Sequence, residues 1–275
     1  MDSQTAATPY RLGFIGGGKL AGSVIRGLVR ARYCAPGLIL VSEPNEATRR
    51  SLEHEAGITG TAENAEVAEK SEVIFIGVKP GVVLPILTEL APLLERKLVI
   101  SLAAGVGIKS MEKCAAAHLM RAMTNTPSAI CRAATAIAKG GRTTADELSV
   151  AREIFSAIGA VVEVAENQID AVTALAGSGP AFVYTVIESL ARGGEKMGLG
   201  PDAALTLATQ TVLGAAQLAS ETKMSPEDLR KMVVTPGGTT AAGLAAMEEH
   251  KTADGLIAAV EAAAKRGAEM ARENA

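Results

Sequence analysis

The sequence predicts an α/β fold, in which an N-terminal Rossmann-like, doubly wound parallel sheet is followed by an all-α domain. Through the first half of the chain, short β-branched runs alternate with helical stretches, a pattern typical of βαβ units. A glycine-rich segment, residues 16–18, follows the first of these runs. After about Asn167 the strand-like runs stop, and Ala, Leu, Gly and Met dominate. We therefore expect a dinucleotide-binding sheet domain at residues 1–166 and a helical domain at residues 167–275.

The predicted strands are brief and almost continuously apolar, as parallel strands are when helices cover both faces of a sheet. The stronger runs lie at 12–15, 38–42, 73–78, 98–102 and 118–123, and weaker runs at 135–138 and 161–164 can extend the sheet.

The second half carries repeated helix-start signals. Gly179-Pro180, Pro201-Asp202 and Ser225-Pro226 each begin a helix, because Pro suits a first turn and Ser caps it, and Asp254 is expected to cap the last helix. The helix at 201–220 is apolar or small on every side, so apolar surroundings must enclose it completely. One small domain would struggle to do so. We therefore expect an all-α dimerisation domain in which two copies interlock, with a monomeric bundle as the alternative.

The composition argues against several classes of protein. The chain has 275 residues, of which 48% are hydrophobic and 21% charged, as in ordinary globular proteins. A net charge of −3 and 3% aromatic residues give neither the basic surface nor the stacking groups that nucleic acids require, so we expect no nucleic-acid partner. The three cysteines are scattered, which predicts no disulfide framework, no metal site and a reducing compartment.

A cytoplasmic location without a membrane partner is the expectation from the hydropathy pattern. Residues 1–10 lack the basic and apolar regions of a signal peptide. The uncharged run at 203–220 is short for a membrane span and contains Thr, Gln and Gly, so a buried helix is the better interpretation.

The glycine-rich segment fits the dinucleotide-binding fingerprint when it is written Gly16-x-Gly18-x-x-Ala21. Gly16 makes the tight turn, Gly18 lets the backbone approach the pyrophosphate, and Ala21 permits close packing of helix on strand. The pyrophosphate then lies at the N-terminus of the following helix, where free N–H groups and the helix dipole favour an anion. A flexible glycine loop is the alternative, but strand, loop, helix and second strand occur here in the required order.

The residues after the second predicted strand bear on the choice between the two nicotinamide cofactors. Glu43 lies about where an acid binds the 2′-hydroxyl of the adenosine ribose and selects NAD. Ser42, Asn45, Arg49 and Arg50 can instead accommodate the 2′-phosphate of NADP, and Glu43 can equally point to solvent. The sequence leaves this choice open.

Further segments contain candidate ligand-binding groups. Residues 78–80, Val-Lys-Pro, and 103–105, Ala-Ala-Gly, each follow a predicted strand and so lie at the carboxyl edge, where open α/β folds bind ligands. Lys79 can equally be a solvated loop residue. In the helical half, residues 234–240 form a Pro-Gly-Gly turn that enters a helix beside two hydroxyls. Such a turn is a plausible nest for a small carboxylate, and an ordinary interhelical turn is the alternative.

Taken together, these segments resemble the pyrroline-5-carboxylate reductases, which catalyse the last step of proline synthesis. The matching stretches are GFIGGGKLAG at 13–22, VKP at 78–80, AAG at 103–105, R-AMTNTP at 121–127, IDAVTALAGSGPAF at 169–182 and TPGGTT at 235–240. They span nearly the whole chain in the order of the family. The resemblance implies a Rossmann domain and a helical domain that forms an intertwined homodimer, and in several members such dimers assemble into decamers.

The resemblance also implies site residues. The substrate, pyrroline-5-carboxylate or proline, is expected near Glu166, Thr239 and Thr240. NADPH is the expected cofactor, with NADH as the alternative. Members of the family bind the cofactor through residues that match Ile15, Gly16, Gly17, Gly18, Lys19, Leu20, Ser42, Pro44, Asn64, Gly77, Val78, Lys79, Pro80, Leu102, Ala103 and Ala104.

The chain departs from the family pattern at a few positions. Thr124 stands where many members have Pro, Ala176 replaces the usual Ser, and Thr235 replaces the commoner Ser. These changes look tolerable. Met232 stands where some members place a polar Asn near the cofactor, which puts that one contact in doubt.

The mechanism expected from the resemblance is hydride transfer to the C=N carbon of the cyclic imine. A protonated imine is electrophilic, so the protein must mainly position it and bind its carboxylate, and no strong base is required. Backbone N–H groups of Gly238 to Thr240 are expected to hold the carboxylate. The Thr240 hydroxyl, as the catalytic group, is expected to bond the ring nitrogen and help supply its proton. The three histidines are expected to be solvated or structural.

Two other functions compete with this one. A 3-hydroxyacid dehydrogenase shares the architecture but takes its proton acceptor from a Lys on the helix after a Gly-rich turn, and residues 177–187 contain no Lys. A non-catalytic nucleotide-binding scaffold would keep the glycine loop. The intact segment at 235–240 argues against a scaffold, which has no use for a carboxylate nest.

Overall fold

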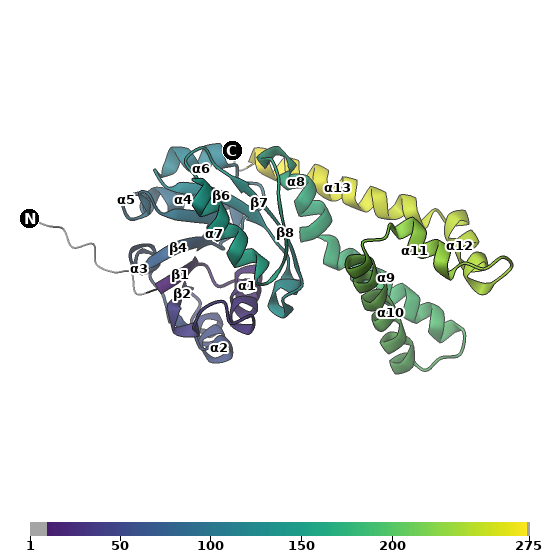
Figure 1. Cartoon of the computed structure of the whole chain (residues 1–275). Helices are drawn as coiled ribbons and strands as arrows, with labels where there is room; N and C mark the ends of the chain where they lie inside the picture. Colours follow the sequence, from purple (N-terminus) through teal and green to yellow (C-terminus); the bar gives the residue numbers. More distant parts are fainter. Residues whose placement is uncertain (1–9, 274–275) are drawn as a thin grey trace, which may run out of the picture. The chain divides into compact units, whose positions relative to one another are not determined.

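The computed structural model describes residues 10–273, and its first half is built on one eight-stranded sheet with the order β3-β2-β1-β4-β5-β6-β7-β8 (Figure 1). Neighbouring strands pair in parallel from β3 to β6, β7 is antiparallel to β6, and β8 is parallel to β7. The strands are β1 (Tyr10–Ile15), β2 (Ile39–Ser42), β3 (Thr59–Thr61), β4 (Ser71–Ile76), β5 (Leu98–Ser101), β6 (His118–Met123), β7 (Ala133–Lys139) and β8 (Gly159–Glu163).

The predicted doubly wound sheet is confirmed, with corrections at the ends of its strands. Every predicted strand is present, but β4 ends at Ile76, because Gly77 and Val78 already belong to the loop after it. Leu38 lies in the short 3-10 helix Pro36–Leu38 instead of in β2. The sequence did not predict β3, whose residues Thr-Gly-Thr are polar and few, so they carry no apolar run.

Helices cover both faces of this sheet and bury a hydrophobic core on each. On one face α1 (Lys19–Arg30), α2 (Glu46–Ala56) and α7 (Ala145–Ser156) pack against side chains that include Phe14 and Phe75, whose rings stack 4.5 Å apart. On the other face lie α3 (Asn64–Lys70), α4 (Pro80–Glu89), α5 (Ala91–Leu94), α6 (Ile108–Cys114) and α8 (Ile169–Val172). The central strands are therefore buried on both sides, as their continuous apolar runs predict, whereas the edge strands β3 and β8 are partly exposed.

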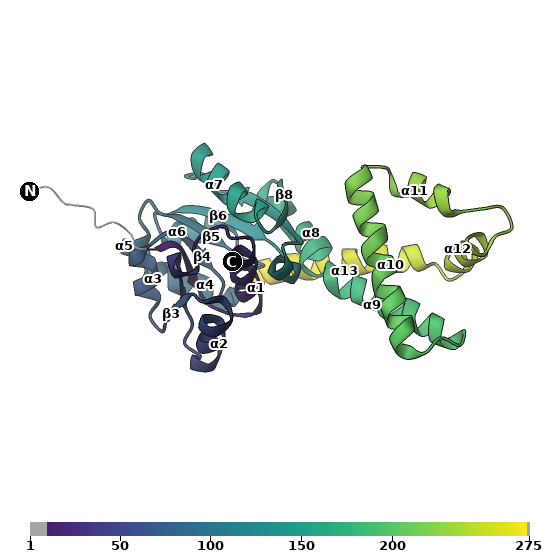
Figure 2. The ribbon, with the colours of Figure 1, turned by 60° about the horizontal axis from the view of Figure 1, so that its bottom comes forward.

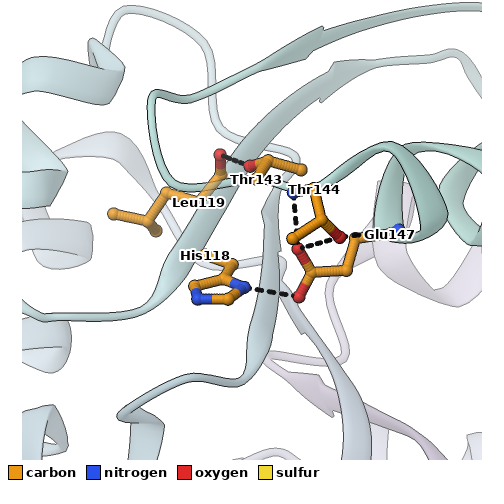
Figure 3. A network of polar contacts seen from close by, with 5 residues as sticks. All are labelled: His118, Leu119, Thr143, Thr144 and Glu147. Carbon is orange, nitrogen blue, oxygen red and sulfur yellow. Dashed lines mark hydrogen bonds and ion pairs between the residues drawn. The ribbon is translucent and has the colours of Figure 1, made fainter.

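A polar network fixes the start of α7 against β6 (Figure 3). The Thr144 hydroxyl accepts a hydrogen bond from the Glu147 N–H, and the Glu147 carboxylate accepts one from the Thr144 N–H, at 3.2 and 2.8 Å. This reciprocal pair is a capping box, which satisfies N–H groups that the first helical turn leaves free. The other Glu147 oxygen lies 2.6 Å from Nδ1 of His118, at the start of β6. His118 thus has a structural partner.

The chain divides into two compact units. One contains the sheet, ends at Ser178 and takes up the chain again from Ala262, and the other is Gly179–Glu261. We call the first the sheet unit and the second the helical unit. The compact division therefore falls after Ser178, whereas the sequence suggested a domain boundary after residue 166. In the described part of the chain no strand follows Glu163.

The helical unit contains α9 (Gly179–Lys196), α10 (Pro201–Thr222), α11 (Pro226–Val233), α12 (Thr239–Glu249) and the first part of α13 (Thr252–Glu273). The predicted starts of α9, α10 and α11 are confirmed, and α10 runs alongside α9 (Figure 2). Asp254 does not cap the last helix, because α13 begins two residues earlier, at Thr252. Lys251, directly before it, has a positive φ of 50° and so separates α13 from α12. Asp254 lies in the first turn of α13 instead, where an acid still suits the helix dipole.

Between residues 10 and 273, none of the helices combines the length and the apolar character that a membrane span requires.

Candidate functional site

The loops that contain most of the predicted cofactor residues lie together at the carboxyl edge of the sheet. Strands β1, β4 and β5 are neighbours, and hydrogen bonds continue the ladder one residue beyond their ends. The Gly77 N–H donates to the Ile15 carbonyl at 2.8 Å, and the Leu102 N–H donates to the Ile76 carbonyl at 2.9 Å. At β1 the connections of the sheet turn from one face to the other, which is where open α/β sheets bind ligands.

Two glycines at this edge, Gly16 of the glycine loop and Gly77 after β4, are too close to their neighbours to carry side chains. Gly16 has a φ of +94°, and a Cβ on it would lie 2.8 Å from Cγ1 of Val78. A Cβ on Gly77 would lie 2.7 Å from the Cβ of Ala21, the small residue that the fingerprint requires. Gly16 and Gly77 are therefore fixed as glycines by the packing of α1 against β1 and β4.

Gly18 differs from these two glycines because the space beside it is open. A Cβ on Gly18 would have no atom within 4 Å. Gly18 is the N-cap of α1, and no side chain of residues 10–273 caps that helix. The first N–H groups of α1 therefore remain available to a ligand, and they favour an anion such as a pyrophosphate.

A cavity of about 460 Å³ lies beside this helix end, at the carboxyl edge of the sheet. Predicted cofactor residues and residues without a predicted role line it together. The lining residues are Lys19, Leu20, Gly77, Val78, Pro80, Leu102, Ala103, Ala104, Met123, Thr124, Asn125, Thr126, Gly177 and Met270.

A second cavity of about 590 Å³ adjoins the first and shares Lys19 and Thr126 with it. Gly17, Gly18, Ser23 and Arg26 of α1, and residues of α2 line the rest of its wall. Two adjoining cavities that meet at the first residue of α1 suit an extended ligand with two halves and an anionic centre. A dinucleotide has this form, with its pyrophosphate between its two nucleosides. The residues present therefore fit a nicotinamide dinucleotide.

Other predicted cofactor residues lie outside the walls of both cavities. Ile15 and Ser42 are fully buried at the ends of β1 and β2. The Ser42 hydroxyl donates to Oδ1 of Asn64 at 2.7 Å, so this pair links β2 to the start of α3. Pro44 and Lys79 are exposed.

The Glu43 carboxylate is held by backbone N–H groups. Oε2 accepts from Gly17 at 3.0 Å, and Oε1 accepts from Asn45 at 2.9 Å. The Arg49 guanidinium donates to the Glu43 carbonyl at 2.6 Å, which places a cation at the same turn. Of the sequence interpretations for Glu43, the one in which it points to solvent is wrong, because the side chain turns back onto the glycine loop.

The predicted substrate residues belong to different units. Glu166 lies in the sheet unit, where its carboxylate accepts a hydrogen bond from the Ile108 N–H and approaches Arg121. Gly238, Thr239 and Thr240 lie in the helical unit, where Gly238 is the N-cap of α12 and Thr239 is its first residue. Among residues 10–273 no side chain caps α12, so the Thr239 and Thr240 N–H groups remain free for a carboxylate, as the sequence suggested. The Gly238 N–H, which the sequence analysis also assigned to the carboxylate, instead donates to the Thr235 carbonyl at 3.0 Å. Met232 is 67% exposed in the same unit.

The segment after β6 is a part of the site to which the sequence assigned no role. Thr124 to Thr126 line the cavity, although residues 121–127 were noted only as a family motif. Thr124, which replaces the more frequent Pro, forms a buried hydrogen bond of 2.8 Å with the Thr135 hydroxyl. Asn125 accepts from the Ala134 N–H and donates to the Ala176 carbonyl, at 3.2 and 3.1 Å.

The structure also adds Gly177 and Met270 to the cavity wall. Gly177 ends a π-helical turn, Thr173–Gly177, and irregular turns of this kind are frequent at functional sites. Met270 lies beyond the last matching motif, and no local pattern of the sequence could have indicated it.

A metal centre finds no support in the described residues, among which no group of three or more His, Cys, Asp or Glu could hold an ion. The three cysteines, all of which are described, are free.

Comparison with known proteins gives a consistent result along the whole chain. A family model described as pyrroline-5-carboxylate reductase dimerisation matches residues 166–270, and one described as NADP oxidoreductase, coenzyme F420-dependent, matches residues 11–105. A pyrroline-5-carboxylate reductase from Synechocystis sp. is 42% identical over 264 residues, which cover 96% of this chain and 99% of the relative.

Solved structures agree with the sequence comparison. A pyrroline-5-carboxylate reductase from Coxiella burnetii superposes with a TM-score of 0.87 at 35% identity, over 95% of this chain and 98% of that chain. A pyrroline carboxylate reductase from Plasmodium falciparum, solved with NADP bound, has a TM-score of 0.86 at 27% identity, over 97% of this chain and 100% of that chain.

Proposed function

The chain belongs to the pyrroline-5-carboxylate reductase family, and from this premise we propose that it reduces the C=N bond of L-1-pyrroline-5-carboxylate to give L-proline, the last step of proline biosynthesis. The observation that carries the proposal is 42% identity to such a reductase across 96% of this chain. The open helix end at Gly18 and the adjoining cavities support it, because they fit the dinucleotide that this reaction needs.

One assay tests the activity directly. The purified chain should oxidise NADPH or NADH when L-1-pyrroline-5-carboxylate is added, which the fall in reduced-nicotinamide absorbance measures. The matched controls are 3-hydroxyacids with the oxidised cofactors, which test the dehydrogenase alternative. Cofactor binding without oxidation by the cyclic imine would contradict the proposal and favour a nucleotide-binding scaffold.

The nicotinamide cofactor, when bound, supplies the hydride that the imine carbon accepts. Residues that follow strands β1, β4 and β5 hold the cofactor in this proposal. The free N–H groups at the start of α1 bind its pyrophosphate, and Val78 and Leu102 to Ala104 line the cavity beside them. This apolar wall excludes water from the reacting carbon.

The helical unit supplies the substrate carboxylate site in this proposal. The free N–H groups of Thr239 and Thr240 at the start of α12 bind the carboxylate of the imine, whereas the Gly238 N–H already donates to the Thr235 carbonyl at 3.0 Å. The Thr240 hydroxyl hydrogen-bonds the ring nitrogen and stabilises its proton while hydride adds to the neighbouring carbon. Glu166 contributes an anionic carboxylate near the cationic ring nitrogen.

Thr240→Ala tests the role of the hydroxyl. We expect kcat to fall about a hundredfold, in the range that positioned acid–base groups contribute, while the affinity for NADPH stays within about twofold. Thr239→Ala is the matched control, because it removes the neighbouring hydroxyl, that of Thr239, to which the proposal assigns no role in proton transfer. Wild-type kcat in Thr240→Ala would remove Thr240 from the mechanism.

NADPH is the cofactor that we propose, with NADH as the alternative. The support is local: Arg49 places a cation at the turn after β2, and the Glu43 carboxylate is already engaged by Gly17 and Asn45. Parallel kinetics with both cofactors decide the point. A higher kcat/KM for NADH would contradict this choice.

We further propose that the protein works as a homodimer through its helical unit. Large apolar side chains of that unit are exposed, among them Leu207 and Leu213, and the family model that matches residues 166–270 is described as a dimerisation domain. The mass in solution measures the state, and it also tests the predicted decamer. The cytoplasmic location stays a prediction from the sequence.

A further inference from the structure

Arg121 is a charged residue in the middle of β6, between the fully or almost fully buried Met120 and Ala122. Its own side chain is 6% exposed. A buried cation is unfavourable unless a negative charge and hydrogen bonds compensate for the water that it loses. A guanidinium at this position therefore needs a negatively charged partner and hydrogen bonds that compensate for its lost hydration.

The partner of Arg121 in the described chain is Glu166, whose Oε1 lies 3.6 Å from Nη1. Burial lowers the pKa of the Arg121 guanidinium, and the negative charges of Glu166 and Asp170 oppose this shift. Nε and Nη2 are buried and have no hydrogen-bond partner among residues 10–273. The guanidinium therefore acts on one carboxylate oxygen as a nearby charge and does not grip both oxygens.

Glu166 is held from a second side by α6. Its Oε1 accepts a hydrogen bond from the N–H of Ile108, the first residue of that helix. Both contacts thus engage Oε1, and within the described residues Oε2 has neither a hydrogen bond nor an ion pair. The carboxylate is fixed at one oxygen and available at the other.

We propose that Arg121 is a positioning residue, which holds Oε1 of Glu166 so that Oε2 faces the cationic ring nitrogen of the bound substrate and product. This inference rests on the proposed function, because that function assigns Glu166 to the substrate. Proline carries two N–H groups on its ring nitrogen, and a carboxylate oxygen such as Oε2 of Glu166 can accept a hydrogen bond from one of them. A carboxylate without its guanidinium would lose its fixed orientation and part of its affinity for the ring.

The test uses the full-length enzyme and compares Arg121→Met, Arg121→Lys and Glu166→Gln. Arg121→Met keeps the length of the side chain and removes its charge. We expect it to raise the KM for pyrroline-5-carboxylate and the inhibition constant of L-proline about tenfold, with the KM for NADPH within about twofold. Arg121→Lys keeps the charge and should recover most of the loss.

A double-mutant cycle separates positioning from a merely structural role. If Arg121 acts through Glu166, the double variant Arg121→Met/Glu166→Gln should bind the imine no worse, within about twofold, than Glu166→Gln alone. Losses that multiply independently would overturn the inference, and so would equal increases in KM for imine and cofactor. Where Arg121→Met does not fold, the cycle is measured with Arg121→Gln, which also removes the charge, and the same two outcomes decide.

Lys97→Met is the matched control for loss of a half-buried cation. Lys97 donates to the carbonyls of Ala68, Glu69 and Ser71, at 2.6, 3.0 and 3.1 Å, and contacts no predicted site residue. This variant should lower the melting temperature and leave both KM values unchanged. A wild-type enzyme that fails to reduce the imine would contradict the proposed function itself, whereas an active enzyme with independent losses would contradict the role of Arg121 alone.

Discussion

The sheet unit and the helical unit bury their apolar residues very differently. The sheet unit has a core on each face, with side chains such as Phe14, Phe75 and Phe155 at 0% exposure. In the helical unit the buried residues are Ala191, Ala204 and Ala208, and its leucines and methionines are largely exposed. The sheet unit therefore has the interior that a domain needs to fold alone. The helical unit requires a covering surface, which the proposed second copy of the chain would supply.

The largest effect is expected from a charge on the exposed side of α10, which tests whether this face of the helical unit is covered by a second copy. Leu213 is 52% exposed, and the helical repeat places it opposite Ala204, the residue that faces α9. Leu213→Glu should convert the dimer to monomer, with a dissociation constant raised about a thousandfold, because the interface would bury an unpaired carboxylate. Light scattering after size-exclusion chromatography measures the mass.

The control for Leu213→Glu is Val150→Glu, on α7 of the sheet unit, where Val150 is 37% exposed. This variant should keep the wild-type mass. A dimer that persists in Leu213→Glu would show that the exposed face of α10 is not the contact between copies.

Truncation of a core side chain tests whether the sheet unit is stabilised by its own interior. Phe75 is fully buried and packs against both Phe14 and Phe155, with ring centroids 4.5 and 6.0 Å away. Phe75→Ala should lower the free energy of unfolding of the sheet unit by about 3–5 kcal/mol. Denaturant unfolding measures the loss, which should not depend on protein concentration. A strongly concentration-dependent loss would mean that the sheet unit also relies on a partner for stability.

Acid should affect the sheet unit through the His118–Glu147 network (Figure 3). Burial alone would raise the pKa of Glu147, but hydrogen bonds from Thr144 and His118 outweigh it and hold the pKa below its ordinary value of 4.5. A lowered pKa in the folded state means that the carboxylate stabilises the fold fully above about pH 4.5, and that this contribution is lost as the pH falls through the folded-state pKa.

Glu147→Gln should therefore cost about 1–2 kcal/mol at neutral pH and flatten the decline of stability below about pH 4. Melting temperatures across this pH range give the profile. Asp146→Asn is the control, because Asp146 shares the first turn of α7 but is exposed and forms no bond to His118. If the melting temperature of Glu147→Gln falls at low pH as steeply as that of the wild type, the His118–Glu147 network does not cause the acid dependence of stability.

The smallest effect concerns Tyr33, also in the sheet unit. Burial raises its pKa to about 12 against the opposing influence of Arg11, whose guanidinium stacks on the ring at 4.5 Å. The folded state therefore prefers the neutral phenol, and this contribution is lost as the pH rises from about 10 towards about 12. An ultraviolet titration should show a late tyrosine step that Tyr33→Phe removes. A late step that survives would belong to another tyrosine.

The sequence was a good guide where function and local pattern coincide. The central strands of the sheet were predictable because burial on both faces makes them apolar throughout, and the glycine loop was predictable because steric contacts at Gly16 exclude other residues. The short polar strand β3 had no such pattern. Its pairing depends on the neighbouring strand β2, which no local window of sequence reveals.

The parts of the site that escaped prediction depend on tertiary contacts. Arg121 lies in an apolar strand, and its relation to Glu166 exists only because the chain returns to β6 after a long separation. Met270 reaches the cavity wall from the last helix of the described chain. The proposed role of Thr240 could be predicted from the motif at 235–240. The motif does not identify the residues of a partner surface that would complete the site.

The reversal of β7 explains why the segment after β6 belongs to the ligand-binding edge. Because β7 returns antiparallel to β6, the chain needs no crossover helix there, and it stays at the carboxyl edge through the short 3-10 helix Thr126–Ile130. The backbone of Ser128 lies so close to Gly27 of α1 that a Cβ on Gly27 would collide with it. The helix whose N-terminus is proposed to bind the dinucleotide thus also packs against the opposite wall of the cavity. A disturbance on the far side of α1 would therefore reach the cavity wall through the packing of α1 against this 3-10 helix, of which the close approach at Gly27 is one part.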